Sequence, residues 1–249
     1  MTPEQVCETI DRLAVGDYAS FGGRLVGPQD PRPGLPADRL LDAPMREAIA
    51  DRFALRFPAY DARAVHSIWT KWYLNAFIPP VLLADVLLGQ SISVDLDELR
   101  FIKGDDERVA AVKICRTHAS NGVEPFRRFR PLLFDHFAPL IAMWCDRTEV
   151  TARVFWSNVG NTFEAMLRRI EAVSGPSERL SEAQRLLSTP TFPSGEPNPL
   201  FDAVHYVLED GAPVRRRRVC CLQYLLPDRR FCKACPIDEA RAPRHQEGT

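Results

Sequence analysis

The residues from Asp61 to Gly89 read DARAVHSIWTKWYLNAFIPPVLLADVLLG and carry a clear helical signal. Asp61 can cap a helix that begins here. Apolar residues recur at helical spacing, and the inward face is expected to comprise Val65, Ile68, Trp69, Trp72, Tyr73 and Phe77. Because proline interrupts helical hydrogen bonding, Pro79 and Pro80 are expected to end this helix and to start another, which stops at Gly89.

Helical patterns also dominate the chain on both sides of this stretch. Helices are predicted over residues 4–15, 44–57 with Asp42 as the cap, 131–145, 149–172, 177–188 and a last one that ends near Leu208, whereas residues 22–36 read as a Gly/Pro-rich loop. Between residues 91 and 115, apolar residues alternate instead. The expected fold is therefore mainly α, with a small β hairpin or meander around 91–115 and a C-terminal cluster-binding loop.

Length and composition indicate an ordinary soluble globular chain. Its 249 residues are 45% apolar and 26% charged, with a formal net charge of −1, so no basic bias indicates nucleic-acid binding. The expected division is a helical body over 1–212 and a cluster-binding segment with its tail over 213–249. The start of the chain lacks a signal-peptide pattern, and the apolar run Val81–Leu88 falls short of the ~20 residues of a membrane span. We expect a cytoplasmic protein, with at most peripheral attachment to the inner membrane.

Four of the seven cysteines lie within sixteen residues near the C-terminus. Cys220 and Cys221 are adjacent, and ten residues separate them from Cys232, which forms a C-x-x-C with Cys235. Thiols at this spacing can bring four sulfurs to one point. A metal ion or an iron–sulfur cluster is the natural occupant of such a point.

Three kinds of occupant compete for these thiols. Structural zinc usually takes two C-x2–4-C knuckles, and only Cys232 and Cys235 have that form. An extended backbone would point the sulfurs of Cys220 and Cys221 apart, so both can bind only if the chain turns sharply or the target exceeds one ion. This favours a two-iron cluster over zinc without excluding zinc. A redox disulfide lacks its strand–helix context, because Pro236 and a polar tail follow the motif.

The ending Cys-Cys-x10-Cys-x2-Cys-Pro resembles that of the FhuF-type ferric siderophore reductases, which carry a 2Fe-2S cluster on this pattern. Residues 154–161, VFWSNVGN, resemble the Trp-x-Asn segment that opens a long helix in that family. A weaker match is IWTKWYL at 68–74, which runs into Pro79 and Pro80. The chain departs from the family at Ser157, where glycine is common, and in the proline-rich loop at 27–36.

The resemblance implies that Cys220, Cys221, Cys232 and Cys235 are the ligands of a 2Fe-2S cluster. It also implies that the reaction is the one-electron reduction of a ferric siderophore, which releases Fe(II) in the cytoplasm. The chain shows neither a G-x-G-x-x-G after a strand nor a Walker A motif. Such a reductase would therefore receive electrons from a separate donor, either a ferredoxin or a flavin reductase.

The arginine run Arg215–Arg218 directly precedes the first cysteines. A charge run is usually a solvated strand edge. Alternatively, arginines beside an anionic cluster would favour its reduced state and raise its potential, and they would attract anionic ferric complexes such as catecholates or carboxylates. Arg218 is the best single candidate for such a role because it lies closest to Cys220.

Further candidates for substrate contact are Trp156, Asn158, Lys71 and Trp72. Aromatic residues at helical spacing belong to the core more often than to a ligand site. Asn158 is either a helix cap or a polar anchor. Lys71 interrupts an apolar segment, so it either faces a pocket or extends its ammonium group to the surface.

The remaining cysteines and histidines show no ligand spacing. Cys7, Cys115 and Cys145 are expected to be buried apolar residues, and no two histidines form an i, i+4 pair that would indicate a second metal centre. Two other classes of function stay open. One is a zinc-stabilised binding module without turnover, and the other is an iron–sulfur electron carrier or sensor, for which the helical body is larger than needed.

Overall fold

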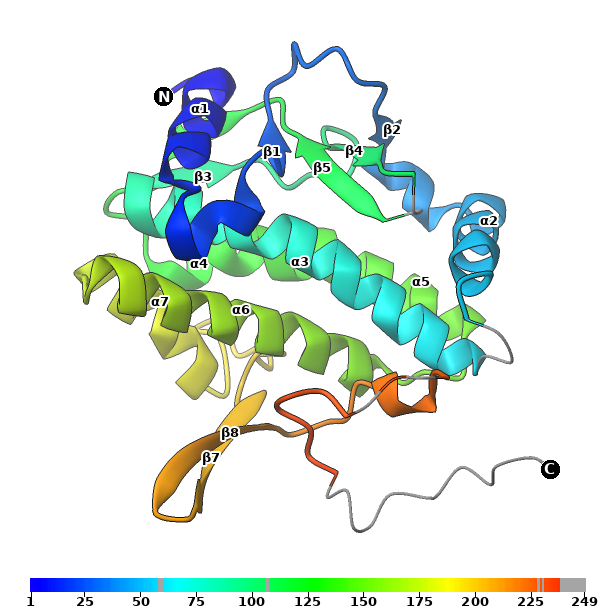
Figure 1. The fold of residues 1–249 in the computed structure, drawn as a ribbon. Helices are drawn as coiled ribbons and strands as arrows, with labels where there is room; N and C mark the ends of the chain where they lie inside the picture. Colours follow the sequence, from blue (N-terminus) through cyan, green and yellow to red (C-terminus); the bar gives the residue numbers. More distant parts are fainter. Residues whose placement is uncertain (58–60, 106–107, 228, 230, 238–249) are drawn as a thin grey trace, which may run out of the picture.

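The computed structural model describes residues 1–57, 61–105, 108–227, 229 and 231–237 (Figure 1). The helical elements are α1 (Pro3–Leu13), η1 (Gly16–Phe21), η2 (Ala37–Leu41), α2 (Ala43–Ala54), α3 (Ala62–Leu88), α4 (Pro125–Arg130), η3 (Pro131–Phe137), α5 (Ala138–Arg147), α6 (Ala152–Ser174), α7 (Glu178–Ser188) and η4 (Gln223–Leu225). The strands are β1 (Leu25–Val26), β2 (Leu35–Pro36), β3 (Gln90–Ile92), β4 (Arg100–Lys103), β5 (Val109–Lys113), β6 (Thr117–Ala119), β7 (Val204–Glu209) and β8 (Ala212–Arg217). The fold is mainly α with small sheets, as the sequence predicts.

Helix α3 forms the centre of the core. It crosses the middle of the molecule and runs alongside α6, while the largest sheet covers its other side (Figure 1). By length and composition α3 could cross a membrane, but 72% of its most apolar stretch is buried inside the protein. A helix whose apolar surface is covered in this way by other parts of the protein is a core helix.

The expectation that Pro79 and Pro80 divide this stretch is wrong, because α3 continues through both. Each interior proline costs a helix about 3 kcal/mol, since it removes a backbone donor and crowds the preceding turn. Both prolines are buried with their apolar neighbours, and this burial offsets the cost. The helix ends as predicted at Gly89, whose φ of 64° lies in the left-handed region.

The protein contains more β-strands than the sequence predicts. A four-stranded sheet has the order β1-β5-β4-β2, in which β1 and β5 are parallel and the other neighbours are antiparallel. Strands β3 and β6 form a separate antiparallel pair. The strands predicted around 91–115 are therefore present, but the supposed loop at 22–36 adds two more. Short edge strands of this kind take their pairing from distant partners, so local sequence gives little signal for them.

The last helix predicted to end near Leu208 is wrong as well, because residues 204–209 form β7, which pairs with β8. Between these strands Asp210 and Gly211 have φ values of 50° and 78°. An Asp-Gly pair in this conformation is the usual two-residue turn of a β-hairpin. The hairpin projects from the helical body (Figure 1) and returns the chain towards α3 and α6.

Four smaller details differ from expectation. Asp42 stands at the start of α2 but caps it with no side-chain hydrogen bond, and it pairs with Arg39 instead. Cys7 is buried as expected, whereas Cys115 is exposed and Cys145 half-buried. The helix predicted from residue 131 begins at residue 125. The predicted segment 213–249 includes residues 238–249, which lie outside the described residues.

Candidate functional site

The adjacent cysteines lie where the chain leaves β8 and turns sharply. Leu222 has a φ of 61° and a ψ of 8°, a left-handed conformation that is rare for a residue with a branched side chain. Its backbone N–H donates to the Sγ of Cys220 over 3.3 Å. The sharp turn that adjacent ligands require is therefore present, and it points a backbone donor at sulfur.

The four thiols are arranged as two pairs. The Sγ atoms of Cys221 and Cys232 lie 3.8 Å apart. The Cys235 thiol is close enough to Cys220 to add to the rise in the Cys220 pKa, which burial mainly causes. The C-x-x-C is closed into a turn by a hydrogen bond from the Cys235 N–H to the Cys232 carbonyl, 2.9 Å long. All four cysteines are free thiols.

The four thiols have the number and type of donors that a 2Fe-2S cluster needs. In such a cluster each iron takes two thiolates, whereas structural zinc gathers four ligands around one ion. Within the described residues, no group of three or more His, Cys, Asp or Glu side chains is placed so that it could hold a metal ion. The ligand set therefore suits a two-iron cluster by the number and type of its donors.

Helices α3 and α6 hold the cysteine loop in place. Ser67 of α3 donates its hydroxyl to the carbonyl of Cys221 over 2.9 Å. Ser157 of α6 donates to the carbonyl of Val219 over 3.2 Å. These two bonds tie the backbone around the adjacent cysteines to the core, so the loop is positioned by the most buried part of the molecule.

A buried polar network lies behind this loop. Arg217 is only 1% exposed and donates to the Oδ1 of Asn158 over 2.5 Å and to the Oγ of Ser157 over 3.1 Å. Asn158 is fully buried and donates to the Oγ of Ser67 over 3.1 Å. Arg217 also donates its backbone N–H to the carbonyl of Ala234, between the cysteines of the C-x-x-C, over 2.8 Å. Asn158 is thus a polar anchor rather than a helix cap.

Two cations favour negative charge on sulfur. The Nζ of Lys71 lies 3.5 Å from the Sγ of Cys221 and 3.1 Å from the Oε1 of Gln223. The pKa of Cys221 is lowered, first by the hydrogen bond from the Cys232 thiol and then by the charges of Lys71 and Arg217. The pKa of Cys232 is raised because that thiol keeps the shared proton and is buried. Among the four cysteines, the protein therefore stabilises the thiolate of Cys221.

The arginine run divides between two faces, as strand alternation requires. Arg217 points into the buried network, and Arg215 pairs with Glu164 of α6. On the other face, Arg216 pairs with Glu209 at 2.7 Å and Arg218 with Asp202 at 2.8 Å. The side chain behind the cysteines is therefore that of Arg217, and the favoured Arg218 lies on the surface. Strand alternation would have indicated this had the hairpin been recognised.

The remaining candidates lie at different depths. Trp72 is 37% exposed, contrary to the inward position predicted for it, and the guanidinium of Arg108 lies 4.0 Å from the centre of its ring. Trp156 is partly buried against the core. Of the predicted substrate residues, the structure brings Lys71 and Asn158 to the cysteine loop. It adds Ser67, a buried serine that sequence patterns did not single out.

Residues 67–214, more than half of the chain, match the sequence model of the family described as "Ferric iron reductase FhuF-like transporter". The chain belongs to this family. The matched range contains Ser67, Lys71, Ser157 and Asn158, and it ends before the first of the clustered cysteines. The FhuF-like match thus covers the helices that hold the cysteine loop.

The chain is also similar to the ferric siderophore reductase of Escherichia coli (strain K12). The two sequences are 31% identical over 175 residues, which are 69% of this chain and 64% of that protein. The match therefore spans slightly less than two thirds of the relative's length.

Solved structures with a similar fold include a synthetase and a biosynthesis protein. The ATP-bound aerobactin synthetase IucA from a hypervirulent pathotype of Klebsiella pneumoniae has a TM-score of 0.58 at 11% identity, over 81% of this chain and 49% of that one. The petrobactin biosynthesis protein AsbB from Bacillus anthracis str. Sterne has a TM-score of 0.52 at 14% identity, over 69% of this chain and 36% of that one. At these identities the similarity is one of fold alone.

Proposed function

We propose that this protein is a ferric siderophore reductase in which Cys220, Cys221, Cys232 and Cys235 hold a 2Fe-2S cluster. When bound, the cluster supplies one-electron transfer. The observation that carries the proposal is the pairing of four thiols beside two cations, on helices of the FhuF-like family. The name of the E. coli relative supports the choice of substrate.

The residues around the sulfurs set the electrostatics of the site. Lys71 and Arg217 favour additional negative charge near the thiolates, and the N–H of Leu222 does the same at Cys220. Such groups raise a reduction potential, because they stabilise the reduced state more than the oxidised one. Ser67 and Ser157 fix the backbone, so these donors keep their places.

The substrate iron changes its affinity for oxygen when it gains an electron. Ferric iron is a hard cation that siderophore oxygens hold strongly, whereas ferrous iron is larger and less charged and is held more weakly. Reduction therefore releases the metal without breaking a covalent bond of the siderophore. No general acid or base is required, and the protein's role is to bind the complex near the sulfurs and to tune the electron donor.

We further propose that the reaction takes place in the cytoplasm, with at most peripheral membrane contact, and that a ferredoxin or a flavin reductase supplies the electrons. The seven free thiols support a reducing compartment. The absence of a nucleotide-binding motif from the sequence supports a separate donor.

The reaction can be tested by a single turnover. Protein reduced anaerobically with dithionite and freed of excess reductant is mixed with ferric siderophores, and a ferrous chelator traps the product. We expect the visible spectrum of the oxidised cluster to return as Fe(II) appears in equal amount. Cys232→Ser serves as the control and should give neither signal. A reduced cluster that no ferric siderophore reoxidises would instead identify an electron carrier or sensor.

A further inference from the structure

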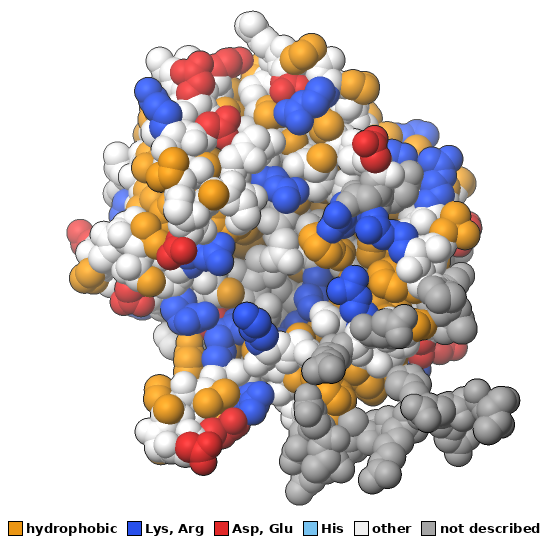
Figure 2. Space-filling view, in the orientation of Figure 1, with side chains coloured by type: hydrophobic (Ala, Val, Ile, Leu, Met, Phe, Trp, Pro, Cys, Tyr) orange, Lys and Arg blue, Asp and Glu red, His pale blue; other side chains and the backbone are white. Residues whose placement is uncertain are grey.

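A groove of about 560 Å³ lies between η1, α3 and α6. Its walls include Phe21 from η1, Trp72 and Pro79 from α3, and Met166 from α6. Figure 2 shows Lys and Arg side chains gathered around the middle of the face on which these elements lie. The volume is within the range of pockets that enclose small-molecule ligands.

The groove has an excess of positive charge. Arg24, Arg168 and Arg169 line it, and none of the three forms an ion pair with a carboxylate among the described residues. Arg24 is held by the carbonyl oxygens of Val109 and Ala110, which fix its guanidinium without neutralising it. Asp17 is the one acidic side chain among the described lining residues.

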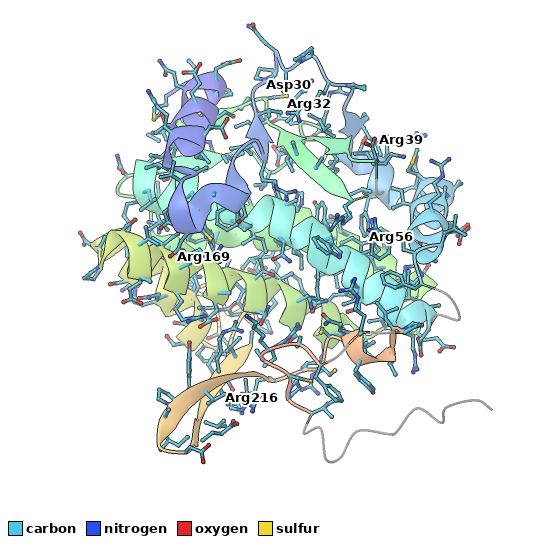
Figure 3. The ribbon with its side chains drawn as sticks, viewed as in Figure 1. Asp30, Arg32, Arg39, Arg56, Arg169 and Arg216 are labelled. Atoms are coloured by element: carbon cyan, nitrogen blue, oxygen red, sulfur yellow. The ribbon has the colours of Figure 1, made fainter. Side chains whose placement is uncertain are left out.

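The arginines on the hairpin and directly after it differ from those of the groove, because they pair with carboxylates. Arg215, Arg216 and Arg218 each have a carboxylate within 2.8 Å. Figure 3 shows Arg169 on α6 and Arg216 on the hairpin, whereas Arg215 reaches Asn161 at the edge of the groove with its charge paired to Glu164. The charges available to an incoming anion are therefore those of the groove rather than those of the arginine run.

The groove adjoins a smaller cavity beside the cysteine loop. This cavity, of about 140 Å³, shares Trp72 and Asn75 with the groove. Its other walls include Lys71 and Gln223, and the Nζ of Lys71 is 3.5 Å from the Sγ of Cys221. The side chains of Trp72 and Asn75 thus lie between the groove and a cavity lined by a residue that contacts the sulfur of Cys221.

We propose that this groove is the siderophore site and that it selects ferric complexes of net negative charge, in which catecholate or carboxylate oxygens surround the iron. The planar guanidinium groups of Arg168 and Arg169 suit such oxygens, because they present several donors in a fixed fork. The aromatic ring of Trp72 supplies apolar contact at the end nearest the cysteines. The identity of the ligand rests on the proposed reductase function.

Gallium(III) complexes separate binding from reduction, because gallium matches ferric iron in charge but is not reduced. Calorimetry with the cluster-loaded full chain would compare the gallium complex of a tris-catecholate siderophore with that of a neutral tris-hydroxamate siderophore. We expect the double variant Arg168→Gln/Arg169→Gln to weaken tris-catecholate binding about tenfold or more and tris-hydroxamate binding less than about twofold. Both arginines are exposed, so the variant should fold normally.

The matched control is Arg216→Gln/Arg218→Gln, which removes the same charge from the hairpin and should change either affinity less than about twofold. Three results would overturn the proposal: no measurable binding of the tris-catecholate complex, equal binding to the groove variant and the wild-type protein, or a larger loss in the hairpin variant. If selective binding is found but ferric complexes never reoxidise the reduced protein, the groove stands and the reductase function fails. If ferric complexes reoxidise the reduced protein but the groove variant binds the tris-catecholate complex as tightly as the wild-type protein does, the reductase function stands and the groove proposal fails.

Discussion

The two ends of α3 each lie beside a buried arginine, and the two charges are balanced differently. Near the C-terminal end, the Nε of Arg128 lies 3.3 Å from Asp85 and its Nη1 2.7 Å from Glu182. Near the N-terminal end, Arg217 donates to the neutral oxygens of Ser157 and Asn158, and no described carboxylate pairs with it. Burying a charge is costly unless an opposite charge accompanies it.

The difference indicates what each end of the helix does. The group around Asp85 joins two arginines, Arg128 and Arg179, to the carboxylates of Asp85 and Glu182. Burial raises the pKa of Asp85 although the two arginines lower it. At the other end, the buried Nε of Arg217 has no described hydrogen-bond partner, and the charge of Arg217 helps to lower the pKa of Cys221. We infer that one end is structural and that the other is built around an anionic cofactor.

A third buried basic side chain beside α3, that of His136, needs no counter-charge because it is neutral. His136 is fully buried, donates from Nδ1 to the carbonyl of Val94 and accepts at Nε2 from the hydroxyl of Tyr73. Burial lowers its pKa from 6.5 to about 4. The same helix thus lies beside a carboxylate-paired cation, a neutral base and a buried cation that no described carboxylate pairs with.

The largest expected effect comes from removing one proposed cluster ligand near the N-terminal end of α3. In Cys232→Ser the iron content of anaerobically purified protein should fall almost to background, because one iron loses a ligand. Metal analysis and visible absorption measure the change. The exposed Cys115→Ser is the control and should keep its iron. Full iron loading of Cys232→Ser would show that the ligand assignment is wrong.

The next largest effect is expected at Asp85, near the C-terminal end of α3. Asp85→Asn should lower the free energy of unfolding by about 3 kcal/mol, because it leaves Arg128 buried with only part of its counter-charge. Denaturant titration measures this loss, and the cluster spectrum should not change. Glu209→Gln, at an exposed pair with Arg216, should cost less than about 1 kcal/mol. Equal losses in the two variants would contradict a structural role specific to Asp85.

Because His136 is neutral in the folded protein, the free energy of unfolding should depend on pH, by an amount similar to the effect of Asp85→Asn. Between pH 6.5 and about 4 the unfolded chain protonates its histidine while folded His136 stays neutral, so stability is lost as pH falls. The total contribution is about 3 kcal/mol. Denaturant titrations at a series of pH values would show a shallower dependence in His136→Gln than in the wild-type protein. An unchanged slope would mean that His136 is charged in the folded state.

A smaller shift is expected in the cofactor itself. Arg217→Met should lower the reduction potential by about 60–130 mV, since a charge-assisted interaction is worth about 1.5–3 kcal/mol for the one electron transferred. Arg216→Met, at a partly exposed ion pair with Glu209, should shift it by less than about 40 mV. Redox titrations followed by visible absorption measure both values. Equal shifts would attribute the effect to net charge rather than to the buried position of Arg217.

Local patterns predicted much of the helical framework. The amphipathic stretches that became α1 and α7 carry their own caps, Thr2 and Ser177, and that of α6 carries its own apolar spacing, so their type follows from nearby residues. The continuity of α3 through Pro79 could not be predicted in this way, because it depends on burial by distant elements. The prediction of a helix up to Leu208 is wrong, although Asp210-Gly211 is itself a turn signal for a β-hairpin.

The candidate site, too, has one part that local sequence predicts and one part that depends on distant residues. Cysteine spacing indicated that four thiols could gather, and the structure places them as two pairs. The role of Arg217 depends on contacts with residues about sixty positions away in the sequence, which spacing within the motif does not reveal. The serine of α3 that anchors Cys221 is likewise distant in sequence and carries no motif of its own.

The most direct test is the metal content and paramagnetic resonance spectrum of anaerobically purified protein before and after dithionite. The account predicts two irons per chain, no stoichiometric zinc, and a signal from one unpaired electron that appears on reduction and is absent from Cys232→Ser. A colourless protein with one zinc per chain and no signal would contradict it, and would identify the cysteine loop as a structural zinc site.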